Sequence, residues 1–94
     1  MQSRTLSGMG DQAQNNANAL TEQLQAEISA SSYRSIRKVA EALGVDYTTF
    51  YRWVTGKRDI SMSTVFRVLE LLEIEPSAFF TDAQRRAERG SATD

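Results

Sequence analysis

The segment spanning residues 35–58, SIRKVAEALGVDYTTFYRWVTGKR, most strongly constrains how this chain folds. It contains two runs in which apolar residues recur three and four positions apart, the spacing that places side chains on one face of an α-helix. The apolar positions are Ile36, Val39, Ala40 and Leu43 in the first run and Phe50, Trp53 and Val54 in the second. Because only Gly44 to Asp46 separate the runs, the pattern predicts two short helices joined by a tight turn.

Both runs are bounded by residues that start or stop helices. Ser35 and Asp46 stand just ahead of the runs, where a side-chain oxygen can accept from the free amides of a first turn. Gly44 and Gly56 follow the runs, where the chain needs a residue that tolerates positive φ. Val45 can fix the entry to the second helix as a hydrophobic staple. Helices linked this tightly cross steeply, as in a helix-turn-helix, whose second helix presents its outer face to the major groove of DNA.

The N-terminal third divides into two parts. Leu20, Leu24 and Ile28 repeat every four residues and predict a first helix over about residues 18–30. Residues 1–18 are mostly Gln, Asn, Ser and Gly with one Leu. Ordering them would bury too little apolar surface to offset the lost entropy, so we expect a disordered N-terminal tail.

A fourth helix is predicted over residues 62–72, with Ser61 as its N-cap. Its apolar residues recur at helical spacing, so one face should pack inward. The side chains expected to face inward are Met62, Val65, Phe66, Leu69 and Leu72.

The remaining C-terminal residues also predict helices. Pro76 suits the first turn of a short fifth helix. Thr81 and Gln84 form a capping-box pattern, which would begin a last helical stretch over residues 82–89, stopped by Gly90. The sequence shows no strand pattern, so the expected fold class is all-α: a compact domain of four to five helices with a central helix-turn-helix.

The composition excludes several kinds of site. The 94 residues allow one small domain and include neither cysteine nor histidine. Disulfides, thiolate or imidazole zinc sites, and Ser-His or Cys-His catalysis are therefore excluded. No paired carboxylates with a pocket or other catalytic set can be placed, so we expect no enzyme activity, metal or cofactor. No apolar stretch approaches the roughly 20 residues of a membrane span and no signal-peptide pattern is present, so we expect a cytoplasmic, nucleoid-associated protein with no membrane contact.

The charge is distributed unevenly along the chain. The net charge of the whole sequence is −1. Residues 31–68, however, carry seven basic and three acidic side chains, a local charge of +4, while the segments on either side are acidic. A basic helix-turn-helix favours a polyanion as its partner.

The run GVDYTTFYRWVTGKR resembles the turn and recognition helix of the Cro and lambdoid-repressor helix-turn-helix proteins, also called the XRE family. The resemblance continues through residues 61–74 and 76–80. It implies a lambda-repressor-like fold with a DNA-binding domain at 19–80. The tail at 1–18 and a C-terminal helical extension and tail at 81–94 lie outside the resemblance.

The outer face of the second helix of the motif predicts contacts with base edges. If the apolar run faces the core, helical geometry places threonines, tyrosines and an arginine on the opposite side. Arg52 can donate two hydrogen bonds to guanine, and the threonines and tyrosines can contact thymine methyl groups or base edges. A polar face that is merely tolerated is the alternative. The predicted base contacts are Tyr47, Thr48, Tyr51 and Arg52. The resemblance implies the same role for Tyr47, Thr48 and Arg52.

Contacts with the DNA backbone are predicted on both sides of the turn. Arg37 and Lys38 lie in a first helical turn, where the helix dipole disfavours cations until a phosphate arrives. The resemblance implies that the loop after the second helix grips the backbone, and that Thr49 occupies a phosphate position. Solvated cations are the alternative for both groups. The full predicted set is Ser35, Arg37, Lys38, Thr49, Thr55, Lys57 and Arg58. The chain departs from the family at Ile36, where Gln is common, and at Val54-Thr55, where Glu-Asn is common.

Together these features predict a sequence-specific, DNA-binding transcriptional regulator. The resemblance favours a repressor of phage or prophage type that reads the major groove of an operator with the helix at 46–55. An antitoxin of the same fold, which binds a toxin and represses its own promoter, is the first alternative. A protein-binding adaptor without DNA binding is the second.

A two-fold dimer on DNA is also expected, because one recognition helix reads few base pairs. The interface should involve the wide apolar face of the fourth helix and the segment at 76–87. The predicted interface residues are Val68, Leu71, Phe79 and Phe80. A monomer whose C-terminal segment covers these side chains is the alternative.

Overall fold

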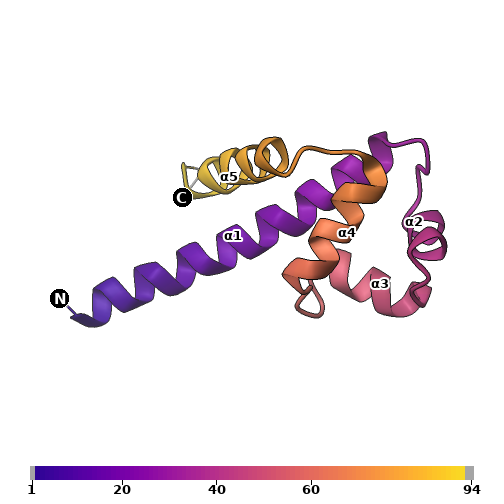
Figure 1. Cartoon of the computed structure of the whole chain (residues 1–94). Helices are drawn as coiled ribbons and strands as arrows, with labels where there is room; N and C mark the ends of the chain where they lie inside the picture. Colours follow the sequence, from indigo (N-terminus) through magenta and orange to yellow (C-terminus); the bar gives the residue numbers. More distant parts are fainter. Residues whose placement is uncertain (1, 93–94) are drawn as a thin grey trace.

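The computed structural model describes the backbone of residues 2–92 and the side chains of residues 14–89. Five helices make up this part of the chain, and no strand occurs in it (Figure 1). The helices are α1 (Gln2–Ala30), α2 (Ile36–Leu43), α3 (Tyr47–Val54), α4 (Met62–Leu72) and α5 (Pro76–Ala92). The predicted all-α fold with a central helix-turn-helix is therefore confirmed.

The predicted helix caps are present in the structure. The side chains of Ser35, Asp46 and Ser61 each accept a hydrogen bond from the backbone amide three residues later. Gly44 ends α2 at a φ of 73°, in the left-handed region that favours glycine. Gly56 follows α3 at a φ of 80°. Local sequence therefore defines both ends of each helix in the motif.

Helix α1 is longer than expected. The sequence pattern predicted a helix from about residue 18, whereas α1 begins at Gln2. Residues 2–18 contain no proline and include Ala, Gln and Met, which favour helix. Extending an existing helix costs far less than nucleating one, so the turns packed at 19–28 can propagate toward the N-terminus.

Helix α5 is continuous across the predicted break at Thr81. The Thr81 hydroxyl donates to the carbonyl of Ser77 within the helix at 2.8 Å, so this residue is not an N-cap. The helix also continues through Gly90 to Ala92. The prediction of two separate stretches was wrong, because a capping-box pattern starts a helix only where the preceding backbone is not already helical.

The core lies where α1, the helix-turn-helix, α4 and the start of α5 meet. Trp53 packs against it and is half-buried, in agreement with its predicted role in packing. The buried cluster consists of Leu24, Ile28, Val39, Ala40, Phe50, Val54, Val65, Val68, Leu69 and Phe79.

The inward face of α4 differs from the predicted one. Met62 and Phe66 were expected to face the core but are 50% and 46% exposed. Val68, a predicted dimer residue, is instead fully buried. Val65, Val68 and Leu69 form the inward stripe, and α5 runs alongside α1 rather than over the outer side of α4 (Figure 1). Nothing within the described chain therefore covers the outer side of α4 completely.

The same packing corrects the predicted dimer interface. Phe79 is fully buried within one chain, so neither it nor Val68 offers exposed surface to a partner. Leu71 and Phe80 are half-buried. The Phe80 ring meets the exposed Phe66 ring edge to face, with centroids 6.0 Å apart. The exposed apolar surface thus centres on Phe66 rather than on Val68.

Candidate nucleic-acid interface

Helix α3 presents an outer face whose polar groups are uncommitted. Thr48 and Arg52, one helical turn apart, are both exposed. Neither side chain makes a hydrogen bond or ion pair with any described residue. An unpaired guanidinium on an exposed helix face keeps all five of its donors available to a ligand.

Two tyrosines form the adjacent stripe of α3. Tyr47 is half-buried and Tyr51 is 39% exposed. Their ring centroids are 5.8 Å apart, with an interplanar angle of 41°. The guanidinium carbon of Arg37, from α2, lies 4.1 Å from the Tyr47 ring centroid, which is within cation–π distance. The helical repeat predicted the face but not this contact, which depends on the crossing of α2 and α3.

The carboxy-terminal carbonyls of α3 are all satisfied. The amides of Lys57 and Arg58 both donate to the Arg52 carbonyl, at 2.9 and 3.1 Å. The Trp53 carbonyl accepts from the Gly56 amide. The Val54 carbonyl accepts from Gln25 Nε2 of α1 at 2.7 Å. Since the last carbonyls of a helix have no partner within it, these bonds hold the helix end in place.

Gln25 was not predicted to matter to this site. It lies on α1, 29 residues before its partner, and a polar residue beside an apolar stripe gives no local signal of such a bond. Its side chain connects α1 to the end of α3 and so helps to set the position of the exposed helix face.

Two threonines from the predicted backbone set have committed hydroxyl groups. Thr49 donates to the Asp46 carboxylate at 3.3 Å, and Thr55 donates to the Tyr51 carbonyl at 2.7 Å. A phosphate oxygen needs a donor, and a hydroxyl has one proton. Each threonine would have to give up its present bond to contact phosphate.

The cations of the predicted backbone set remain available. Arg37, Lys38, Lys57 and Arg58 are exposed, and none of them forms an ion pair with a described residue. Ser35 accepts from the Lys38 amide, which leaves the serine proton free to donate. Because the amides of residues 56–58 bond the end of α3, the loop offers charged side chains rather than backbone donors.

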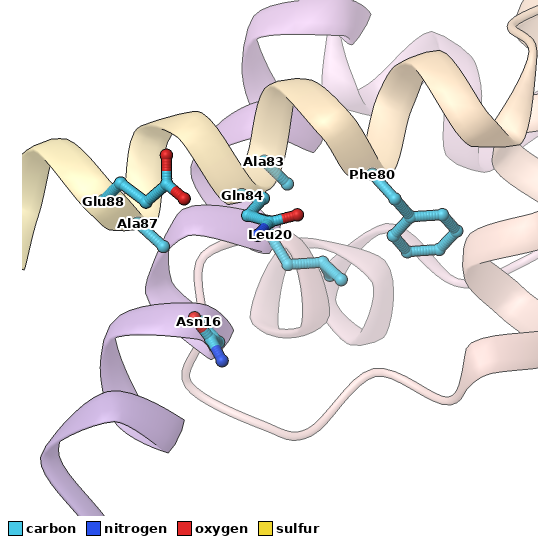
Figure 2. Close-up of a pocket in the computed structure, with 7 residues that line it drawn as sticks. All are labelled: Asn16, Leu20, Phe80, Ala83, Gln84, Ala87 and Glu88. Atoms are coloured by element: carbon cyan, nitrogen blue, oxygen red, sulfur yellow. The ribbon is translucent and has the colours of Figure 1, made fainter. Parts of the chain in front are cut away.

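The described structure also has a groove away from the outer face of α3. A groove of about 510 Å³ lies between α1 and α5, where Leu20 sits beside Ala83 and Gln84, with Phe80 further along α5 (Figure 2). No group of described His, Cys, Asp or Glu side chains could hold a metal ion. Among the described residues, no helix has both the length and the apolar character needed to cross a bilayer.

Comparison with known proteins agrees with this geometry. A family model described as helix-turn-helix matches residues 31–79, which include α2, α3, α4 and the start of α5. Neither the curated proteins nor the solved structures gave a match. The family is one of DNA-binding transcription regulators. The chain belongs to the XRE-type helix-turn-helix family, the family of lambda Cro and repressor.

Proposed function

We propose that this protein is a sequence-specific repressor that reads an operator with the outer face of α3. The observation that carries the proposal is the exposed, unpaired guanidinium of Arg52 on that face, one turn from the free hydroxyl of Thr48. Arginine recognises guanine through O6 and N7, the commonest specific contact in the major groove. The phage or prophage setting rests on the resemblance to Cro and the lambdoid repressors.

The cations around α3 would supply affinity that does not depend on sequence. Arg37 and Lys38 begin α2, while Lys57 and Arg58 follow α3, so basic side chains precede and follow the reading helix along the chain. Neutralising phosphates releases counterions and makes binding fall steeply with salt. We expect this salt dependence to accompany the specific contacts.

Selection of bound sequences from random duplex DNA tests the proposal. A repressor of this kind should enrich one motif, bind it at least 10³-fold more tightly than random duplex at physiological salt, and silence a reporter placed behind it. Equal affinity for all sequences would refute sequence-specific reading. Activation of the reporter would refute repression but would leave sequence-specific binding standing.

A two-fold dimer on DNA is part of the proposal, with a corrected interface. We define the α4–α5 patch as the exposed side chains of Met62 and Phe66 and the half-buried Phe80, whose ring contacts that of Phe66, together with the half-buried Leu20. Leu20 and Phe80 line the adjoining groove between α1 and α5 (Figure 2). Contiguous exposed apolar surface on a soluble chain marks a partner site. A standard interface takes roughly 800 Å² per partner, about an eighth of this chain's 6478 Å².

Sedimentation of Phe66→Ser tests the dimer. The substitution removes the most exposed ring of the patch and should shift the free protein toward monomer, whereas the control Ser63→Ala on the same helix should not. In the dimer, the half-sites of a pseudo-palindromic operator should be centred about 10 base pairs apart. One subunit bound to a non-palindromic selected site would refute the dimer.

The antitoxin alternative shares the DNA-reading face and differs in its protein partner. Its toxin-binding surface would be the acidic carboxy-terminal region, residues 69–94, part of which lines the groove between α1 and α5. Co-expression with the product of the neighbouring gene would separate the two. A stable complex that relieves toxicity would favour the antitoxin.

A further inference from the structure

Three side chains from α2 and α3 form a row of successive contacts beside the outer face of α3, which we call the aromatic ladder: Arg37, Tyr47 and Tyr51. The Arg37 guanidinium lies over the Tyr47 ring at 4.1 Å, and the Tyr47 ring lies 5.8 Å from the Tyr51 ring. Each member therefore restricts the next. Arg37, a predicted phosphate contact, therefore packs against Tyr47 and through it against Tyr51, both predicted base contacts.

The ladder fixes aromatic rings on a surface where they would otherwise rotate freely. A tyrosine side chain has only two rotatable angles, and contacts on the ring remove much of the remaining freedom. Tyr51, at the outer end, is still 39% exposed. The result is a pre-organised apolar surface on the outer face of α3 that loses little entropy when it meets a ligand.

In the major groove, one base presents an apolar group to such a surface. Thymine carries a methyl group at C5, whereas cytosine, adenine and guanine present only polar atoms or C–H edges there. We propose that Tyr47 and Tyr51 read thymine through this methyl group. The inference rests on the proposed function, because it requires α3 to lie in the major groove.

The position of the ladder on α3 constrains where the thymine lies. Tyr47 and Tyr51 form one stripe, and Thr48 and Arg52 form the stripe immediately beside it, each pair separated by one helical turn. Neighbouring stripes on a helix in the major groove face neighbouring base pairs. The thymine should therefore lie within one or two base pairs of the guanine that Arg52 contacts.

The structure also assigns Arg37 a role that the sequence did not predict. It was predicted to hold a phosphate, but its guanidinium lies over the Tyr47 ring. It is a positioning residue for the tyrosines, whether or not its N–H groups also reach the backbone. Lysine would keep the positive charge but lacks the planar group that stacks on aromatic faces.

The test replaces each thymine of the selected site, one at a time, with deoxyuridine, which removes only the C5 methyl group. Burying one methyl group changes affinity by about 4-fold. Substitution at one or two thymines per half-site should therefore weaken binding by about that factor. Unchanged affinity at every position would overturn the inference and leave the proposed function standing. Failure to enrich any site would overturn both.

Protein variants separate the ring from the hydroxyl. Tyr47→Phe and Tyr51→Phe keep the rings and should retain the full deoxyuridine penalty, whereas Tyr51→Ala should abolish it at one position. Loss of the penalty in the phenylalanine variants would show hydroxyl reading and overturn the inference. A penalty that persists in both Tyr47→Ala and Tyr51→Ala would do the same.

Arg37→Lys tests the positioning role, because it keeps the positive charge and should change only the loss of affinity caused by deoxyuridine. The slope of log K against log salt should stay unchanged, while the deoxyuridine penalty should fall below about 2-fold. Arg37→Lys with the full penalty would refute the positioning role. Circular dichroism of each variant would check that the helical fold is kept.

Discussion

Gln25 is the α1 side chain on which the carboxy-terminal end of α3 most directly depends. Its Nε2 donates to the Val54 carbonyl at 2.7 Å, and this contact is partly buried. The other carbonyls at the helix end accept from the backbone of residues 55–58. Of the four carbonyls of residues 51–54, Gln25→Ala would therefore leave only that of Val54 without its protein partner.

The expected loss follows from how hydrogen bonds contribute to stability. A typical bond contributes about 1 kcal/mol net, and leaving a buried acceptor unsatisfied costs about 1 to 3 kcal/mol. Because the Gln25 side chain is half-buried, water can replace it in part. We expect the free energy of unfolding to fall by about 1 to 2 kcal/mol, which for a domain of this size lowers Tm by about 4 to 8 °C per kcal/mol.

Gln25→Glu sharpens the test, since the two side chains have nearly the same shape. At neutral pH a carboxylate cannot donate to the Val54 carbonyl, and its charge would lie at the negative end of the α3 dipole. The loss should exceed that of Gln25→Ala. The protonated form can donate, so folding raises the pKa of the introduced carboxyl above its unfolded value of about 4.3. Its stabilising contribution is present below that pH and is lost as pH rises.

Thermal and urea unfolding followed by circular dichroism would measure these changes. Gln84→Ala, on the exposed side of α5, is the control and should change stability by less than about 0.5 kcal/mol. Gln25→Ala and Gln25→Glu variants as stable as the original chain at pH 7 would refute the reasoning. They would show that water satisfies the end of α3 as well as Gln25 does.

Three further substitutions, with one control, probe the DNA interface and the fold. Arg52→Ala should weaken binding to the selected site by about 1 to 3 kcal/mol and blur preference at one base position; an equal loss on random duplex would identify Arg52 as a phosphate ligand. Lys57→Ala should weaken binding to all sequences and reduce the salt slope by about 0.9 per subunit, whereas Arg85→Ala on α5 should leave the slope as it was. Glu73 ends α4 at a φ of 58°, and glycine at this position would relieve the left-handed strain but add entropy to the unfolded chain. Glu73→Gly should therefore raise the free energy of unfolding by about 0.5 to 1 kcal/mol. An unchanged denaturant midpoint would show that Glu73 is unstrained.

Features set by neighbours in the sequence could be predicted from it. Ser35, Asp46 and Ser61 cap their helices because a cap needs only the next three residues to be helical. Gly44 and Gly56 adopt positive φ for a similarly local reason. The helix-turn-helix follows directly from these short-range requirements.

Features set by packing could not be predicted in the same way. Helix α4 carries more apolar residues than one face can hold, so its pattern alone left Phe66 and Val68 as rivals for the core. Met62, Val65, Phe66, Leu69 and Leu72 form one stripe at helical spacing, and Val65, Val68, Leu69 and Leu72 form another, so spacing cannot choose between them. The direction of α5 along α1 was the missing information.

The bonds from the Lys57 and Arg58 amides to the Arg52 carbonyl have a consequence for how this protein can diverge. They engage the main chain of residue 52, so any amino acid there can make them. The side chain at that position can be exchanged while the loop keeps its register against the helix. A new target preference could therefore evolve by one substitution, with the anchoring loop unchanged.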